Sequence, residues 1–241
     1  MLVNAQYNVA KPKSLSNKIG GHQRRKMFER FVDCMKVGAL DTILDIGVTT
    51  DRSFDDSNYL EAWYPHKSQI TAVGIDNAEF LESLFPGVRF VQADGRDLPL
   101  ESGAFDFVHS SAVLEHVGSR QQQTQFLGEA WRVARKGVFI TTPNRRFPVE
   151  FHTVLPLIHW LPLPLYRKLL VVLGYEFFAD ESNLNLLSVC SLTRAVKAAG
   201  IERFEIGSVS LLGLPTNLTL IARKPIWRAS VAFGADETIV V

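Results

Sequence analysis

Short apolar runs alternate along the chain with segments long enough to hold a helix. Residues 42–47, 70–76 and 88–94 are rich in β-branched side chains, and each run ends at a glycine or an aspartate. Such runs are typical of buried parallel strands that carry a polar group at their carboxyl ends. Two further runs, 105–110 and 137–143, extend the series. The intervening lengths allow right-handed crossovers, so we expect an α/β fold with a doubly wound sheet.

The segment between the last two of these strands predicts a helix. Ser119 and Gln122 form the pattern of a capping box, in which each side chain binds the backbone N–H of the other residue. Apolar side chains then recur at helical spacing and define a buried face: Phe126, Leu127, Ala130, Trp131 and Ala134. Gly137 is expected to end the helix.

The C-terminal third predicts one more helix and a hairpin. Residues 192–199 have a helical pattern closed by Gly200. The apolar runs 204–212 and 217–223 are separated by a short segment that starts at Gly213. This arrangement is consistent with two strands joined by a turn.

Polar residues at the strand ends should converge, because open parallel sheets bind ligands outside the carboxyl ends of their strands. The two carboxylate oxygens of Asp76 suit a ribose diol. At Asp94–Arg96, the carboxylate can accept from an adenine amino group while the following backbone N–H donates to a ring nitrogen. With Gly47 at the first strand end, the pattern predicts a nucleoside-sized site.

The motifs LDIG, VGID, VQADGRDLP, FDFVHSSAVLEHV and EAWRVARKGVFITTPN follow one another between Asp41 and Asn144. In order and spacing they resemble the class I S-adenosylmethionine-dependent methyltransferases, in particular the type 11 branch that includes ubiquinone-biosynthesis-like enzymes. The resemblance implies a seven-stranded Rossmann-like sheet whose last strand is antiparallel, S-adenosyl-L-methionine as cofactor, and a small-molecule acceptor. We expect cofactor contacts from the following residues: Asp45, Gly47, Asp76, Asn77, Asp94, Gly95, Arg96 and Ser110.

The first loop departs from the pattern of that family. The family usually has three alternating glycines after the acidic residue, whereas here only Gly47 is present and an acidic segment, 51–63, follows. We interpret this segment as a remodelled cofactor loop; loss of the site is the alternative. A nicotinamide dinucleotide fits less well, because its pyrophosphate needs a glycine-rich turn with an acidic residue about 20 positions later.

Composition limits the remaining classes. The chain has 241 residues, 46% of them hydrophobic, and a formal net charge of +1, which allows one sizeable core and offers no general attraction to nucleic acid. Cys34 and Cys190 are expected to be isolated buried thiols, and no secretory leader or membrane span is evident, so we expect a cytoplasmic protein. Without Cys-x-x-Cys or His-Glu-x-x-His patterns, the sequence predicts no metal site.

We expect residues 1–241 to form a single domain with two additions. An apolar stripe of Met27, Phe31 and Met35 predicts an N-terminal helical cover within residues 1–40. Residues 147–190 follow the fifth strand as a helical insert or lid, whose apolar first part, 147–178, is broken by prolines. This part has three interpretations: an acceptor pocket, a surface for peripheral contact with lipid or a partner, or ordinary packing on the core.

Methyl transfer from a sulfonium is an in-line displacement that depends chiefly on positioning. An oxygen nucleophile also has to lose its proton, for which histidine is suited near neutral pH. His116, after the fourth strand, and His152, in the insert, are the catalytic candidates, and His109 is a further one. The function that we infer is O-methylation of a glycan or a lipid-linked intermediate; the alternative is a catalytically inactive binding or scaffold protein. The oligomeric state does not follow from the sequence.

Overall fold

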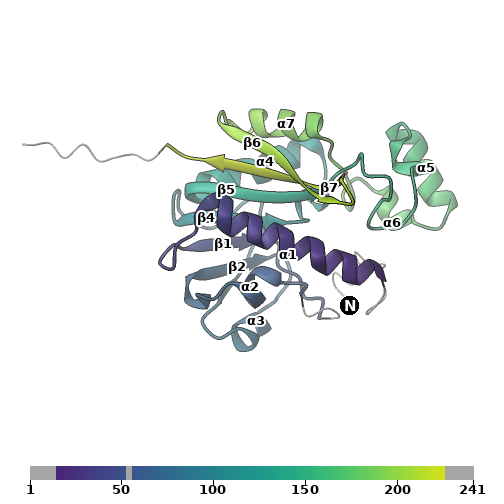
Figure 1. Cartoon of the computed structure of the whole chain (residues 1–241). Helices are drawn as coiled ribbons and strands as arrows, with labels where there is room; N and C mark the ends of the chain where they lie inside the picture. The colour runs from purple at the N-terminus through teal and green to yellow at the C-terminus, as the bar shows by residue number, and fades with distance from the viewer. Residues whose placement is uncertain (1–14, 53–55, 226–241) are drawn as a thin grey trace, which may run out of the picture.

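The computed structural model describes residues 15–52 and 56–225, which form a seven-stranded sheet in the order β3-β2-β1-β4-β5-β7-β6 (Figure 1). The parallel strands are β1 (Ile43–Ile46), β2 (Ile70–Gly74), β3 (Arg89–Gln92), β4 (Phe105–Ser111) and β5 (Ala134–Pro143). Strand β7 (Leu214–Arg223) lies antiparallel between β5 and β6 (Phe204–Leu211). The predicted doubly wound sheet with an antiparallel last strand is confirmed.

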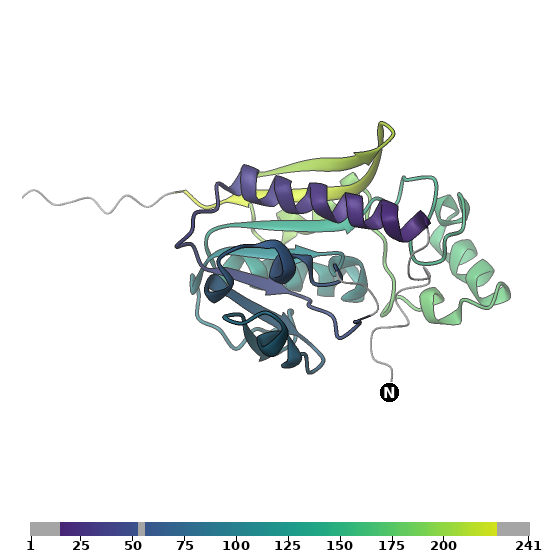
Figure 2. The same cartoon turned by 60° about the horizontal axis from the view of Figure 1, so that its bottom comes forward.

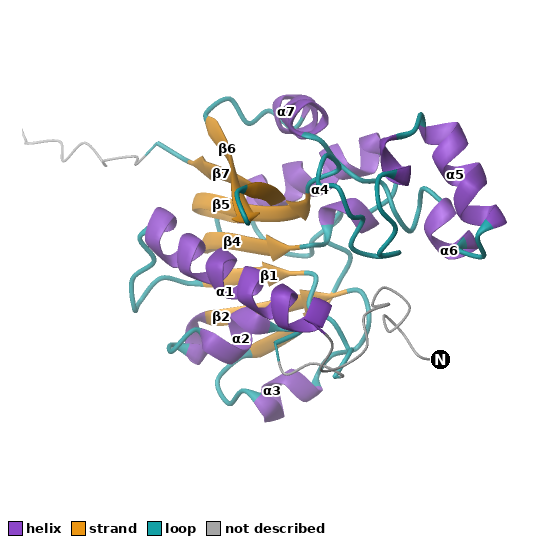
Figure 3. Cartoon of the chain, turned by 45° about the vertical axis from the view of Figure 1, so that its right-hand side comes forward, coloured by secondary structure: helices purple, strands orange, loops and turns teal. Residues whose placement is uncertain are grey.

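Helices cover both faces of this sheet, as Figure 3 shows. On one face lie α1 (Leu15–Met35), α2 (Tyr59–Trp63) and α3 (Phe80–Leu84), which share a hydrophobic core with the sheet. On the other face lie α4 (Arg120–Val133) and α7 (Val189–Ala198), which share a second core. Because both faces are buried, the central strands read as continuous apolar runs, and all four residues of β1 are buried.

Helix α1 runs along the sheet and past the β6–β7 hairpin (Figure 2). Its apolar stripe is buried as the spacing predicted: Met27, Phe31 and Met35 are all covered. The Phe31 ring contacts the rings of His109 and Phe139, with centroid distances of 4.9 and 5.4 Å. The stripe therefore packs against the central strands β4 and β5.

The capping box that starts α4 is present, but the helix ends three residues before the expected stop at Gly137. Ser119 and Gln122 make both reciprocal hydrogen bonds. Ala134 already has extended backbone angles and pairs with Phe105, so sheet hydrogen bonds replace those of the helix. Gly137 instead lies inside β5, where a Cβ atom would come within 2.4 Å of the Ala222 carbonyl oxygen.

The C-terminal hairpin is tighter than the sequence suggested. Leu212 and Gly213 have φ angles of 49° and 81°, which form a two-residue turn of the type that favours the strand twist. Strand β7 therefore begins at Leu214 instead of at Asn217.

The insert folds at the carboxyl edge of the sheet. It contains the 3₁₀ helix η4 (Ile158–Trp160), α5 (Leu163–Val172) and α6 (Glu176–Ala179), around a small core of its own. In Figure 3, the arrowheads of β1 and β4 point toward the side on which α5 and α6 lie. Two other short 3₁₀ helices complete the described elements: η2 (Lys67–Gln69) and η3 (Leu114–His116).

The structure also shows the surroundings of the two cysteines. Cys34 is partly exposed, at the edge of the core that α1 shares with the sheet, and Cys190 is exposed, so the expectation of buried thiols is wrong. Within residues 15–52 and 56–225, no helix combines the length and the apolar character needed to cross a bilayer.

Candidate functional site

A buried chain of polar side chains lies at the carboxyl end of β1. Asp45 Oδ1 contacts His109 Nδ1 at 2.6 Å, and the other ring nitrogen of His109 contacts the Tyr59 hydroxyl at 3.0 Å. His109 is buried on β4, so its partners hold the ring in place and the ring in turn fixes the Asp45 carboxylate. Both ring nitrogens of His109 are therefore engaged within the protein.

A second carboxylate, Glu61, lies beside this chain. It is completely buried, and neither of its oxygens receives a hydrogen bond. Burial raises the pKa of Glu61 well above the ordinary carboxyl range, and the negative charge of Asp45 adds to the effect. Glu61 is therefore held with its proton at pH values where an exposed glutamate is ionised.

Glu61→Gln is expected to stabilise the protein at alkaline pH. Above the ordinary carboxyl pKa, the unfolded chain has lost a proton that the folded protein still holds, so stability falls as pH rises toward the raised pKa. Glutamine removes this dependence and should add about 1 kcal/mol at pH 8 and less at pH 5. Urea unfolding at both pH values measures the difference, with the exposed Glu79→Gln as control. A gain that is equal at both pH values would contradict the assignment.

The turn after β1 is tight because a side chain packs directly on Gly47. Gly47 has a φ of 100°, and a Cβ atom there would lie 2.1 Å from Val113 Cγ2. The backbone N–H groups of Gly47 and Val48 both donate to the Val73 carbonyl, at 2.7 and 3.0 Å. The Val48 side chain then lies against Gly74 at the end of β2. A valine thus occupies the position next to Gly47 without disturbing the turn.

The remodelled loop is anchored by its own polar contacts. Asn58 accepts from the Thr49 backbone N–H and donates to the Thr49 carbonyl, at 2.9 and 3.0 Å. Arg24 on α1 makes a bidentate pair with Asp56, both contacts at 2.9 Å. The Arg52 guanidinium lies 5.0 Å from the centre of the Phe80 ring. The described part of the loop is therefore held by defined contacts to α1, to α3 and within itself.

A cavity of about 170 Å³ lies between this loop and α3. Its lining comes from the loop and from α3 and its flanks: Asp51, Arg52, Ser57, Asn58, Phe80, Leu84 and Phe85. Asp76 is half-buried at the end of β2, and Asn77 is exposed with its side-chain oxygen accepting from the Glu79 N–H. Asp76 and Asn77 do not belong to the lining of this cavity, which α3 and the loop provide.

The expected adenine position is already partly engaged within the protein. Asp94 accepts from the Arg96 side chain through both oxygens, at 2.9 and 3.0 Å, and the guanidinium lowers the pKa of Asp94. Gly95 packs closely, because a Cβ atom there would lie 2.7 Å from both Ile46 and Phe126. The Asp94 carboxylate thus stabilises the turn that contains it. A ligand could bind only the lone pairs of its oxygens that Arg96 does not use.

Ser110 has a different role from the one expected. It is fully buried, and its hydroxyl donates to the Ile46 carbonyl at 2.7 Å. The side chain therefore fastens β4 to the end of β1. This contact uses the hydroxyl proton, and burial keeps the side chain from direct contact with a cofactor.

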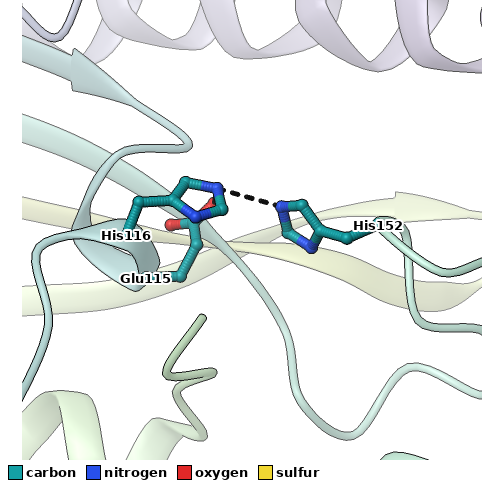
Figure 4. A group of neighbouring side chains, drawn as sticks. All are labelled: Glu115, His116 and His152. Atoms are coloured by element: carbon teal, nitrogen blue, oxygen red, sulfur yellow. Dashed lines mark hydrogen bonds and ion pairs between the residues drawn. The ribbon is translucent and has the colours of Figure 1, made fainter. Parts of the chain in front are cut away.

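Two histidines and a glutamate meet where the insert contacts the end of β4 (Figure 4). His116 Nε2 and His152 Nε2 lie 3.0 Å apart, and Glu115 Oε1 lies 3.7 Å from His116 Nε2. The His116 backbone N–H donates to the Val113 carbonyl at 2.8 Å, so one residue, Val113, contacts both this group and Gly47. The structure thus brings together both catalytic candidates beside the first turn.

The charge states of this group follow from its partners. Burial lowers the pKa of His116 to about 3, and the neighbouring His152 ring contributes. Burial also lowers the pKa of His152, but the Glu150 carboxylate more than offsets it, so the net shift is upward. For Glu150, His152 and the Thr153 contacts outweigh burial and lower the pKa to about 2, whereas burial raises the pKa of Glu115 to about 7.

Two contributors to this group were missed by the sequence analysis: Glu150 as the partner of His152 and Thr142 as the donor to Glu115. Glu115 is adjacent to His116 in the sequence, and the structure makes it a member of the group. No sequence motif with a fixed spacing identifies this group of side chains. His116 and His152 are 36 positions apart and meet only when the insert folds back onto the sheet edge. The acidic residue two positions before His152 was the only available signal, and it has no specificity by itself.

Comparison with known proteins identifies the fold and the domain. Residues 44–141 match a family model described as a methyltransferase domain. No sequence among curated proteins matches the chain.

Solved structures with the same fold include several S-adenosylmethionine-dependent methyltransferases. One from Methanosarcina mazei is 18% identical, with a TM-score of 0.51, and the match covers 80% of this chain and 96% of that one. One from Mesorhizobium loti is 14% identical, with a TM-score of 0.54 and coverage of 82% and 98%. One from Aquifex aeolicus is 15% identical, with a TM-score of 0.52 and coverage of 88% and 99%. At these identities the likeness concerns the fold.

Proposed function

We propose that this chain, a class I S-adenosylmethionine-dependent methyltransferase, transfers the methyl group to a hydroxyl of a lipid-linked or glycan acceptor. The observation that carries this proposal is the group of Glu115, His116 and His152 at the base of an insert rich in exposed apolar side chains. An O–H acceptor has to lose its proton, and these are the proton-binding groups on the acceptor side.

On the cofactor side, we assign roles by position along the sheet edge. Asp76 is proposed to accept from the ribose hydroxyls, with Asn77 beside it, because a carboxylate at the end of a second strand suits a diol. Adenine is proposed to lie against Asp94–Arg96, with a backbone N–H of this turn donating to the ring. Asp45 and Gly47 are proposed to border the methionyl part.

The methyl group would then lie near Val113, between the Gly47 turn and the histidines. Positioning the acceptor oxygen, the methyl carbon and the sulfur in line supplies most of the rate enhancement. Bound S-adenosylmethionine would supply the methyl group, with the electron pair of the broken carbon–sulfur bond going to sulfur, and the histidine group would take the proton of the acceptor hydroxyl in the metal-free protein. Exclusion of water by the insert strengthens the electrostatic part of this step.

The composition of the insert surface favours a lipid-linked acceptor over a fully polar one. Of the fifteen exposed large apolar side chains among the described residues, nine lie between 147 and 178. Three of them, Leu157, Trp160 and Leu161, flank or belong to η4, whereas Tyr166 is buried in the core of the insert. Exposed apolar side chains concentrated in one segment are typical of an interaction surface.

The triple variant Leu157→Ser, Trp160→Ser and Leu161→Ser tests this surface. We expect co-sedimentation with vesicles and methyl transfer to a polyprenyl-phosphate-linked saccharide in those vesicles to fall at least about tenfold, because apolar contact area is lost. Affinity for S-adenosylmethionine, measured by calorimetry, should stay unchanged. The matched control is Leu40→Ser with Leu212→Ser, since these side chains are 86% and 96% exposed elsewhere. Full turnover by the triple variant on the membrane-bound acceptor would overturn the acceptor assignment.

The altered first loop motivates a second candidate function, a binding protein without catalysis. Calorimetry with S-adenosylmethionine and a screen for transfer of a labelled methyl group into lipid and saccharide extracts separate the two. Binding of both S-adenosylmethionine and its demethylated product without any transfer would favour the binding protein. Absence of binding to the folded chain would remove both candidates.

A further inference from the structure

We infer that Glu115, His116 and His152 bind one divalent metal ion through Glu115 Oε1 and the two Nε2 atoms, with the ligand chemistry of Zn²⁺. Metal binding stands on the geometry of these side chains alone. The further step, in which the ion receives the acceptor hydroxyl, rests on the proposed function.

The three ligand atoms are spaced as a small ion requires. They all lie within 4.8 Å of one another, with 3.0 Å between the two nitrogens and 3.7 Å between the oxygen and the His116 nitrogen. Metal–ligand bonds of about 2.0–2.2 Å place neighbouring ligands of a tetrahedral ion about 3–4 Å apart. Figure 4 shows the His116 and His152 rings facing each other, with the Glu115 carboxylate beside the His116 ring.

Each ligand is oriented by a second contact at its other polar atom. His116 Nδ1 donates to the Asn183 carbonyl at 2.6 Å, because a carbonyl can only accept. His152 Nδ1 donates to Glu150 Oε1 at 2.6 Å. The remaining oxygen of the glutamate, Glu115 Oε2, accepts from the Thr142 hydroxyl at 2.8 Å. Histidines that bind metals almost always have such a carbonyl or carboxylate partner at the other ring nitrogen.

Glu150 is itself held firmly. It accepts from the backbone N–H groups of His152 and Thr153, at 2.9 and 2.7 Å, and from the Thr153 hydroxyl at 2.7 Å. Both Glu150 and His152 are buried. The contacts therefore fix the direction of the His152 ring before any ligand arrives.

The charge arrangement at the centre of the group suits a cation. With both Nδ1 atoms protonated, each neutral ring presents a lone pair at Nε2, and two lone pairs 3.0 Å apart need a cation between them. Glu115 is fully buried, and its Oε1 receives no hydrogen bond. A buried carboxylate oxygen without a donor is costly, and a metal ion would satisfy it together with both nitrogens. The competing occupant is a single proton shared by the rings.

The donor set determines the class of metal. Two imidazole nitrogens with one carboxylate oxygen suit Zn²⁺ and its neighbours among the divalent transition metals, whereas Mg²⁺ and Ca²⁺ prefer oxygen ligands. Three protein ligands also leave a coordination position open, as in catalytic zinc sites. An acceptor hydroxyl could occupy that position on the side of the insert.

The reaction then balances without another reactant. With the ion bound, the two Nε2 atoms are ligands and no longer take the acceptor proton themselves. The hydroxyl bound to the ion instead releases its proton to water, because the positive charge stabilises the alkoxide. The alkoxide oxygen forms a bond to the methyl carbon, the carbon–sulfur bond breaks, and sulfur keeps the electron pair. The products are the methyl ether and S-adenosylhomocysteine.

Metal binding is tested on the full chain after treatment with a chelator and dialysis, without cofactor or acceptor. Calorimetric titration with Zn²⁺ should show about one ion per chain, and Co²⁺ should give the visible absorption bands of a four- or five-coordinate ion. His116→Gln and His152→Gln should each weaken binding by at least about 100-fold. Glu150→Gln, which removes only the outer partner, should weaken it by about 10–100-fold. The matched control is His159→Gln, a buried histidine of the same insert whose ring nitrogen contacts the Phe147 carbonyl.

Failure of a folded wild-type chain to bind either ion would overturn the inference, as would equal affinity in the wild type and the cluster variants. Circular dichroism establishes folding; if a histidine variant does not fold, the Glu150→Gln affinity and the wild-type Co²⁺ spectrum decide. A different result is expected if the metal site is real but the proposed function is wrong. In that case the ion binds as expected, but no hydroxyl acceptor is methylated with the ion present. Full methyl transfer by a metal-free chain would support the proposed function and contradict a catalytic role for the ion.

Discussion

Replacing Gly47 by valine is expected to abolish detectable binding of S-adenosylmethionine and to destabilise the fold. A Cβ atom at position 47 would lie 2.1 Å from Val113 Cγ2, and the φ of 100° is unfavourable for any side chain. Strain and overpacking together should cost about 2–6 kcal/mol of unfolding free energy. Moving Val113 or the turn would also displace the wall on which the methionyl part is proposed to lie.

The matched control is Gly103→Val. Gly103 also has a positive φ, of 69°, but a Cβ atom there meets nothing within 4 Å. This variant should show the backbone strain alone and keep its cofactor affinity. Gly47→Val with Val113→Ala should recover part of the stability, because the clash is removed while the backbone strain stays. Urea unfolding and calorimetry measure the two effects, and cofactor affinity retained by folded Gly47→Val would show that the cofactor lies elsewhere.

Asp76→Ala is expected to weaken S-adenosylmethionine and S-adenosylhomocysteine by the same factor. The ribose is common to both ligands, and loss of its carboxylate partner leaves hydroxyl groups unpaired at a cost of about 1–3 kcal/mol, or roughly 5–150-fold in affinity. Asp76 is half-buried at the end of β2, so little effect on unfolding is expected.

The neighbouring Asn77→Ala provides the control, because Asn77 is exposed and its side-chain oxygen is used by the Glu79 N–H. It should change affinity by much less. A selective loss of one ligand in Asp76→Ala would be inconsistent with a ribose contact, since only the methyl group and its charge distinguish the two molecules. Equal effects of Asp76→Ala and Asn77→Ala would place the ribose nearer to Asn77.

The sequence pattern predicted the start of a helix correctly where contacts between residues close in the sequence determine it. The Ser119–Gln122 capping box defines the start of α4 through bonds between residues three positions apart. The end of the same helix was predicted three residues too late, because the decisive interaction is sheet pairing between Ala134 and Phe105. That pairing joins residues far apart in the sequence, and no local signal reports it.

The same distinction applies to individual residues at the strand ends: residue type predicted the backbone requirement at Gly47 but not the side-chain contact of Ser110. Gly47 was identified from its type and place, and its positive φ and close contact with Val113 agree with the reason for choosing a glycine. Ser110 was chosen in the same way, yet its hydroxyl is used inside the sheet by the Ile46 carbonyl. Position at a strand end shows that a residue is near the site, but it does not show which way its side chain points.

The sequence by itself determined the order of strands and helices, the doubly wound class of the sheet and the acidic and glycine residues at its carboxyl edge. These properties follow from periodicity and from residue types that act over a few positions. Only the tertiary structure decided which polar groups share a partner: His109 joined Asp45, and His152 came from the insert to within 3.0 Å of His116. The reason is that hydrogen bonds and metal coordination act over about 2–4 Å in space, whereas the residues concerned are 64 and 36 positions apart along the chain.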